Sequence, residues 1–254
     1  MPISIDSILI GETHETPLSV FADNSGPGRF CCGPRISSPT APDKTAAFDI
    51  TKTSASTDGR LTTFMMELAG IAGSVKPPAI GTLAGAKVQS YVWPTNLDPS
   101  QVGFDKASGI LALAITAHPD FDDTPLYDEN NDGDPANDGA EWHSHWVVLV
   151  KDEACAAGLK VRDVSPGVDL LPDTAPMLPI ALDSPGMSPT LNGKVAQITV
   201  PAGNTETVQF DAVTAELTVN AETKAPLLCV SGVHDVASGD LSLPGIVMKK
   251  ALTN

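Results

Sequence analysis

Short runs of apolar and β-branched residues recur along the whole chain, and glycines and prolines separate them. Segments such as ITV, TTF and VTAELTV are rich in Thr and Val, which favour strands. The 22 prolines and 21 glycines are spread throughout, and such punctuated short runs are typical of a sandwich or barrel. The predicted strands are Ile3–Ile10, Ala46–Thr51, Leu61–Leu68, Ala86–Trp93, Ile110–Ala117, Trp142–Val150, Leu159–Val164, Lys194–Val200, Thr207–Val219 (with a possible break), Leu227–Ser231 and Ile246–Lys249. The pattern therefore predicts an all-β protein, an antiparallel β-sandwich with long loops and little helix.

Helical periodicity is weak. Phe64–Ala72 is the best helical candidate, although flanking glycines disfavour it. Gly11–Thr45 and the Pro-rich segment Ser165–Pro189 are predicted loops, and the second is expected to cross between sheets or cover a sheet edge. We expect a single β-sandwich-like domain over residues 1–254, since the part after Pro189 would be marginal alone. Any domain boundary is expected within residues 165–189.

Two predicted strands, Ile110–Ala117 and Trp142–Val150, are apolar on both faces, which predicts central, buried strands. The loop between them is long for a compact domain, and such loops are usually functional or disordered. If the two strands form an antiparallel pair, the end of the first lies beside the start of the second. His118 then lies next to His143 and His145.

These three histidines form a candidate metal site. His143 and His145 are two residues apart in a strand and therefore share a face. Cross-strand neighbours on one face lie about 5 Å apart, so His118 can reach the same ion. Three imidazoles with one open position are typical of zinc and copper sites. Asp120 or Glu141 is the candidate fourth ligand, or an acceptor for a ring N–H.

The sequence His143-Ser144-His145-Trp146 resembles the zinc-ligand strand of the α-type carbonic anhydrases, which carry H-x-H-W on a β-strand. The resemblance covers four residues and implies a metal-ligating strand. That family takes its third histidine from a later strand, whereas here no histidine occurs between His145 and His234. The activity is therefore not carried over. A cupin site would need a Glu a few residues after H-x-H, and residues 146–150 contain none.

The loop between the two strands is strongly acidic. No Lys or Arg occurs between Lys106 and Lys151, and the acidic residues of the segment are Asp120, Asp122, Asp123, Asp128, Glu129, Asp132, Asp134, Asp138 and Glu141. Asp128, Asn130, Asp132 and Asp134 follow the D-x-N-x-D-G start of a calcium loop. The twelfth position is Gly139 and not Glu, so this is not an EF-hand. We expect a calcium loop of another type, which Glu141 can close.

The overall charge excludes some partners. The formal net charge is −16 and the pI is about 4.4, which argues against nucleic acid and anionic membranes as partners. No stretch of about 20 apolar residues occurs, so we expect no membrane insertion. The N-terminus, MPISIDSILIGE, lacks a basic n-region and a long apolar core, so we do not expect it to act as a signal peptide. We expect a periplasmic or secreted mature form, and a cytoplasmic location stays open. The sequence names no protein partner.

The disulfide candidates are Cys31, Cys32, Cys155 and Cys229. No C-x-x-C pair is present, which argues against a thiolate zinc site. The vicinal Cys31 and Cys32 can pair separately with Cys155 and Cys229, which implies an oxidising compartment. Buried free thiols are the alternative.

Three further polar residues lie outside the three-histidine candidate site. His14 lies in a polar turn and His234 precedes an aspartate, and we expect surface or structural roles for both, although either can add a ligand. Ser144 points away from the face of its two histidine neighbours, which disfavours a Ser–His nucleophile pair.

The sequence supports three functions. The favoured one is a metal-binding protein that sequesters, buffers or delivers zinc or copper through the three histidines, with calcium in the acidic loop. The second is a metalloenzyme of the hydratase or hydrolase type, in which a metal-bound water is the nucleophile and Glu141 or Asp120 the base. The third is a calcium-dependent structural or adhesion module. A binding protein is favoured over an enzyme.

Overall fold

Strands dominate the computed structural model, which describes residues 35–78, 84–118, 141–176, 178–201, 208–220 and 226–250. In this part of the chain the one helix is a short 3-10 helix, η2 (Pro99–Val102). The strands are β1 (Ile36–Ser37), β2 (Ile50–Thr57), β3 (Leu61–Leu68), β4 (Lys87–Pro94), β5 (Ile110–Ala117), β6 (His143–Lys151), β7 (Leu159–Val161), β8 (Leu182–Asp183), β9 (Thr190–Asn192), β10 (Val195–Pro201), β11 (Gln209–Phe210), β12 (Val213–Val219), β13 (Leu228–Val236), β14 (Gly245–Ile246) and β15 (Met248–Lys249). The predicted all-β class with little helix is confirmed.

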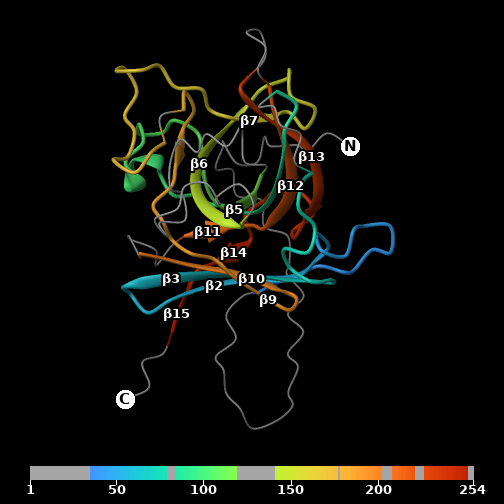
Figure 1. The fold of residues 1–254 in the computed structure, drawn as a ribbon. Helices are drawn as coiled ribbons and strands as arrows, with labels where there is room; N and C mark the ends of the chain where they lie inside the picture. Colours follow the sequence, from blue (N-terminus) through green and yellow to red (C-terminus); the bar gives the residue numbers. More distant parts are fainter. Residues whose placement is uncertain are drawn as a thin grey trace.

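The larger sheet closes on itself. Its strands follow the order β5-β4-β12-β13-β7-β6, and β6 pairs in turn with β5, so that six strands form a barrel. All of these pairings are antiparallel. Figure 1 shows the barrel as a ring of strands above a second sheet, with β5 on the side nearest that sheet. The predicted antiparallel sandwich is therefore not what this sheet forms. It is a closed barrel, because β6 pairs with β5 as well as with β7.

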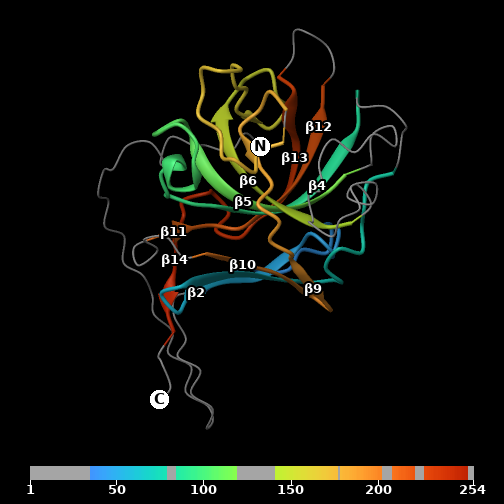
Figure 2. The same cartoon turned by 60° about the vertical axis from the view of Figure 1, so that its left-hand side comes forward.

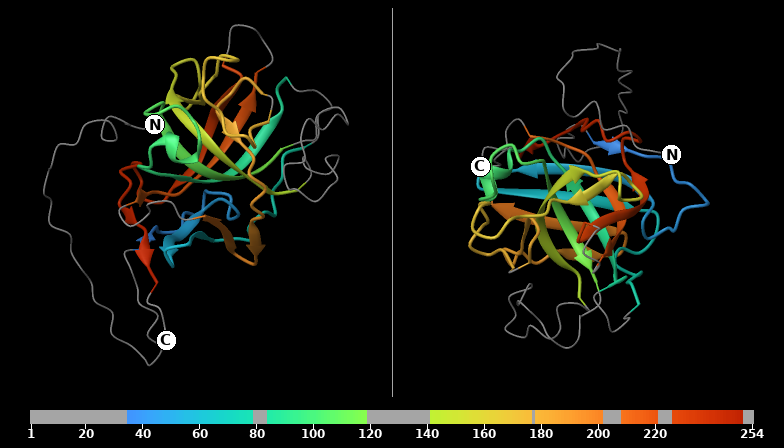
Figure 3. Two further views of the ribbon diagram at one scale, coloured as in Figure 1. Left: turned by 90° about the vertical axis from the view of Figure 1, so that its left-hand side faces the viewer. Right: turned by 90° about the horizontal axis from the view of Figure 1, so that it is seen from above.

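The second sheet has the order β1-β2-β3-β10-β9, with β15 added in parallel to β2. It lies flat against one side of the barrel (Figure 2). Seen from above, its strands cross those of the barrel instead of running along them (Figure 3). A small pairing of β11 with β14 completes the described sheets.

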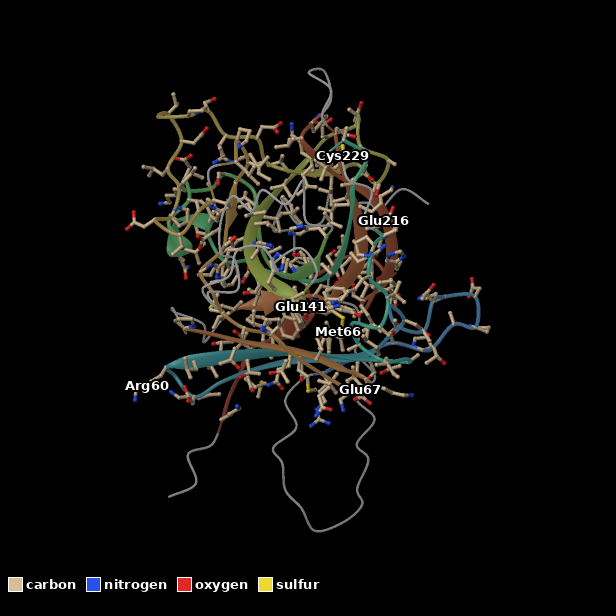
Figure 4. The ribbon with its side chains drawn as sticks, viewed as in Figure 1. Arg60, Met66, Glu67, Glu141, Glu216 and Cys229 are labelled. Atoms are coloured by element: carbon tan, nitrogen blue, oxygen red, sulfur yellow. A yellow bond between two sulfur atoms is a disulfide. The ribbon has the colours of Figure 1, made fainter. Side chains whose placement is uncertain are left out.

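Alternating side chains explain why the two layers pack. On β3, Phe64, Met66 and Leu68 are buried, and the residues between them are more exposed. Figure 4 shows Met66 on the barrel side of β3 and Glu67 on the opposite side. Apolar side chains of β4, β5 and β6 complete this core, among them Trp93 and Leu113. An alternation with period two places one face of each strand in the core.

The other faces of β5 and β6 line the barrel. Ala112 and Ala114 of β5 and Val147 and Leu149 of β6 belong to a second apolar cluster with residues of β4, β7, β12 and β13. Both strands are therefore buried on both faces, as the sequence predicts. His143 and His145 lie on this same inner face of β6, at its first and third positions.

The predicted strand Leu61–Leu68 is confirmed as β3, and the weak helical candidate Phe64–Ala72 is not a helix. Its first half belongs to β3, and Ala69 and Gly70 follow in a bend, because the apolar positions alternate with period two and not three to four. The predicted break within Thr207–Val219 is present between β11 and β12, whereas β13 runs five residues beyond the predicted end at Ser231. The predicted strand Ile3–Ile10 and most of the predicted loop 11–45 lie outside the described residues.

The Pro-rich segment 165–189 connects the two layers. It leaves the barrel after β7, pairs with β6 through β8, and leads to β9 of the second sheet.

In the described part of the chain no helix is long and apolar enough to cross a membrane.

Candidate metal centre

The predicted antiparallel hairpin of β5 and β6 is present. Its register places Thr116 opposite His143 and Ala114 opposite His145. His143 and His145 share one face of β6 because residues two apart in a strand point the same way. His118 comes directly after β5 and continues the row formed by Ala114 and Thr116. The hairpin therefore brings the three histidines together at one end of the barrel.

The imidazoles are close enough to share one ion. His118 Nε2 lies 3.0 Å from His143 Nε2, and the ligand nitrogens of the three residues all lie within 4.8 Å of one another. The ring centroids of His143 and His145 are 4.7 Å apart, with an interplanar angle of 86°. Tetrahedral zinc with Zn–N bonds near 2.0–2.1 Å separates its ligand nitrogens by about 3.4 Å. One ion can therefore reach all three nitrogens after small side-chain rotations.

Hydrogen bonds at the far side of two rings fix their orientation. His143 Nδ1 lies 3.0 Å from the carbonyl oxygen of Glu141. Since a carbonyl only accepts, Nδ1 carries the proton and Nε2 presents its lone pair to the cluster. His145 Nδ1 lies 3.0 Å from Ser184 Oγ, which leaves Nε2 of His145 as its ligand atom. Metal-bound histidines are commonly held by such hydrogen bonds on the second nitrogen.

The centre is buried on one side and reaches the surface on the other. His143 and His145 are 1% and 2% exposed, whereas His118 is only partly buried. Among the described residues no Asp, Glu or Cys joins the three histidines in one ligand group. Three imidazole nitrogens suit zinc or copper better than calcium or magnesium, which prefer oxygen ligands.

Glu141 contacts the centre through its backbone. Its carboxylate is exposed and lies 3.5 Å from Lys76 Nζ, while its carbonyl oxygen faces His143. The structure therefore does not bring this candidate carboxylate to the imidazoles. Asp120 and the calcium candidates Asp128, Asn130, Asp132 and Asp134 lie outside the described residues.

Two residues with a hydroxyl group, Ser184 and Thr116, lie at the centre but are not predicted from the sequence. Ser184 follows β8, and the pairing of β8 with β6 brings it to His145. Nothing in the Pro-rich sequence around Ser184 indicates this contact. Thr116 lies on the inner face of β5, opposite His143. Its spacing of two residues from His118 is the signal that could have placed it in the site.

The cysteines pair differently from the prediction. Cys155 and Cys229 form a disulfide with each other, with their Cα atoms 5.3 Å apart, and not one each with the vicinal pair. Cys155 follows β6 and Cys229 lies on β13, at a seam of the barrel where the two chain segments meet. Cys31 and Cys32 lie outside the described residues.

His234 has a structural environment separate from the centre. Its ring stacks on Phe48, with centroids 4.5 Å apart, and its Nε2 lies 2.9 Å from Gln89 Oε1. Burial lowers the pKa of His234, and the nearby Glu216 carboxylate partly offsets this effect. Ser144 points away from its histidine neighbours and donates to the carbonyl of Met187. His14 lies outside the described residues.

Comparisons of the chain with protein-family models, with curated proteins and with solved structures found no match. The three histidines on the buried hairpin are therefore the feature that points to a function.

Proposed function

We propose that the protein binds one zinc or copper ion through His118, His143 and His145, and that it sequesters, buffers or delivers this metal. The observation that carries the proposal is the three-histidine cluster itself, with all ligand nitrogens within 4.8 Å of one another. Most side chains inside the barrel are apolar, and polar side chains are rarely buried without a partner or an ion.

The fixed orientation of the rings supports the proposal. Both buried imidazoles use Nδ1 for a hydrogen bond to the protein, so a metal would be bound through Nε2. Preorganised ligands lose little side-chain freedom when the ion binds. The hairpin strands that carry them are buried on both faces, which makes the support rigid.

A binding role is favoured over hydratase or hydrolase chemistry. A general base must lie within hydrogen-bonding reach of the water that it activates. Within the described residues, the candidate base Glu141 directs its carboxylate to Lys76. The calcium site at Asp128, Asn130, Asp132 and Asp134 stays a separate proposal, as does the calcium-dependent module built on it.

A periplasmic or secreted location is part of the proposal. The disulfide between Cys155 and Cys229 supports it, because disulfides persist mainly in oxidising compartments. In such a compartment the protein would meet metal ions outside the cytoplasmic buffering systems.

The proposal is tested by metal quantification on protein prepared without a histidine tag. We expect one equivalent of zinc or copper per chain in the wild type, and less than a tenth of that in His143→Gln/His145→Gln, since three imidazoles bind far more tightly than one. An electron paramagnetic resonance spectrum separates copper(II), which gives a signal, from zinc, which gives none.

The matched control is His234→Gln, which removes an imidazole outside the centre and leaves a side chain that can still hydrogen-bond to Gln89. It should keep the wild-type metal content. Wild-type protein that binds neither zinc nor copper on titration would overturn the proposal. Circular dichroism of the metal-free double variant shows whether the fold is retained.

A further inference from the structure

Thr116 carries a buried hydroxyl with no hydrogen-bond partner. The residue is 7% exposed, and its Oγ1 contacts neither a donor nor an acceptor. Other buried hydroxyls nearby are satisfied: Ser90 Oγ donates to the carbonyl of Ala215, and Thr95 Oγ1 to that of Leu111. Leaving a buried hydroxyl without a hydrogen-bond partner destabilises the folded state. Such an atom in a native site points to a missing water, ion or ligand.

The position of Thr116 places it among the three imidazoles. It lies directly opposite His143 in the β5–β6 register and two residues before His118. His145 lies two residues along β6 from His143, opposite Ala114. All four side chains therefore occupy one face of the hairpin. On its other flank Thr116 pairs with Ser90 of β4. Ser90 and the neighbouring Ala114 are both small, so no long side chain from these two positions covers the hydroxyl.

The two buried histidines cannot satisfy this hydroxyl while they bind a metal. Each uses Nδ1 for a partner elsewhere and Nε2 for the ion. A neutral threonine hydroxyl is itself not among the ligands usual for zinc or copper. The Thr116 hydroxyl therefore needs a hydrogen-bond partner other than these two rings or the ion itself.

We propose that Thr116 is a positioning residue for a small exogenous ligand at the open coordination position of the metal. This inference rests on the metal site proposed above. The ligand class is water or a monovalent inorganic or carboxylate anion. One lone pair of the ligand goes to the metal and another accepts the Thr116 O–H. His143 and His145 are buried on one side of the site, which favours a small ligand. The metal is thus held in a form that can take and release a small anion, and not in a closed structural site.

The test compares azide binding to the cobalt(II)-substituted protein in Thr116→Val and Thr116→Ser. Valine has the shape of threonine without the hydroxyl, whereas serine keeps the hydroxyl. We expect all three proteins to bind one equivalent of cobalt with equal affinity. The azide dissociation constant, read from the visible absorption of cobalt, should rise about tenfold in Thr116→Val, which is the loss of one hydrogen bond to a charged group. It should stay within about threefold of the wild type in Thr116→Ser.

The metal-free proteins give a second readout. If the hydroxyl has no partner in the fold, Thr116→Val should melt at or above the wild-type temperature, because replacing an unsatisfied hydroxyl by a methyl group of the same shape is neutral or stabilising. A lower melting temperature, or failure of Thr116→Val to fold, would assign the hydroxyl a structural partner and overturn the inference.

The outcomes also separate this inference from the proposed function. Equal azide affinity in the wild type and Thr116→Val, or no azide binding to either, overturns the role of Thr116 while the metal site stands. Failure of the wild type to bind cobalt overturns the metal site itself.

Discussion

At the scale of single residues, the centre depends on what holds each imidazole. His145 is fixed by Ser184, which lies outside the hairpin and comes from the Pro-rich connection between the two layers. A hydrogen bond at Nδ1 holds the ring orientation and raises the basicity of Nε2. Ser184 is completely buried, so water cannot replace it freely.

We therefore expect Ser184→Ala to weaken metal binding about tenfold, the lower end of what such supporting contacts contribute. The measurement is a competition titration against a chromophoric chelator. Ser144→Ala is the matched control, because Ser144 is equally buried, lies beside His145 in sequence, and points its hydroxyl to Met187 on the other face. Equal losses in both variants would show a general packing effect and contradict a specific role for Ser184.

A second residue-scale prediction concerns Asp211, which is buried between β11 and β12. Its carboxylate accepts from the backbone N–H of Ala212 and from the hydroxyl of Ser238. Burial nevertheless raises the pKa of Asp211 above its ordinary value of 3.8. The folded protein therefore binds this proton more tightly than the unfolded chain does. As pH rises from the unfolded pKa through the raised folded pKa, the contribution of Asp211 to the free energy of unfolding falls.

Asp211→Asn removes this titration, so its free energy of unfolding relative to the wild type should increase with pH across that window. Urea unfolding at a series of pH values between about 2 and 7 measures the difference, because the Asp211 effect lies above pH 3.8 and the Asp58 effect below it. Asp58→Asn should give the opposite slope, because backbone N–H groups of Leu61 and Arg60 lower the pKa of Asp58. The Asp58 contribution is present above pH 3.8 and is lost as pH falls through the lowered pKa. Equal slopes in the two variants would contradict both assignments.

At the scale of elements, the barrel is closed unevenly. The seam between β5 and β6 has seven paired residues, whereas β13 meets β7 at a single pair, Cys229 with Lys160. One further backbone bond, from Ala157 N to the carbonyl of Val230, crosses there. The disulfide lies at this second seam, and Figure 4 shows Cys229 on the side of the barrel away from the second sheet. A covalent bond thus supplements the seam with the fewest strand pairs.

Replacing both cysteines by alanine should lower the free energy of unfolding by about 4 kcal/mol, the loop-closure entropy expected for a separation of 74 residues. Urea unfolding with and without reductant measures it. The reductant should lower the midpoint of the wild type and leave that of the Cys155→Ala/Cys229→Ala variant unchanged. Since His143 and His145 lie at the start of β6 and Cys155 lies beyond its end, the variant should keep its metal stoichiometry when folded. A non-reducing peptide map that links either cysteine to Cys31 or Cys32 would contradict the pairing.

The sequence was informative about elements wherever a local pattern determines them. The hairpin of β5 and β6 follows from two apolar runs, and its antiparallel pairing brings His118 to His143 as expected. The closure of the barrel does not follow from any local pattern, because it depends on β6 pairing with β5 and β7 at once. Ser184 and the partner of Cys155 are also set by contacts between segments far apart in sequence. Long-range placement of this kind leaves no signature in one sequence.

At the scale of the whole molecule, the barrel and the second sheet share one core. Phe64 of β3 packs against Trp93 of β4, with ring centroids 6.1 Å apart. Polar contacts also cross between the layers. Trp93 Nε1 donates to Thr53 Oγ1 of β2 at 3.2 Å, and the backbone N–H of Ile50 donates to Asp235 of β13 at 2.7 Å. Neither layer can be removed without exposing this surface and leaving these groups unpaired.

This shared core leads to the expectation of a single cooperative unfolding transition, as for one domain. Trp93, Trp142 and Trp146 all belong to the core between the layers, so tryptophan fluorescence reports on their separation, whereas far-ultraviolet circular dichroism reports on the strands of both. The two signals should change at the same urea concentration, and the calorimetric enthalpy should equal the van't Hoff enthalpy. A fluorescence transition that precedes the loss of strand signal would mean that the barrel survives alone. In that case the Pro-rich segment 165–189, which joins the barrel to β9, would contain a domain boundary after Ser184. The metal centre should then persist after the second sheet has separated, because its histidines lie on the barrel and the pairing of β8 with β6 holds Ser184 beside His145.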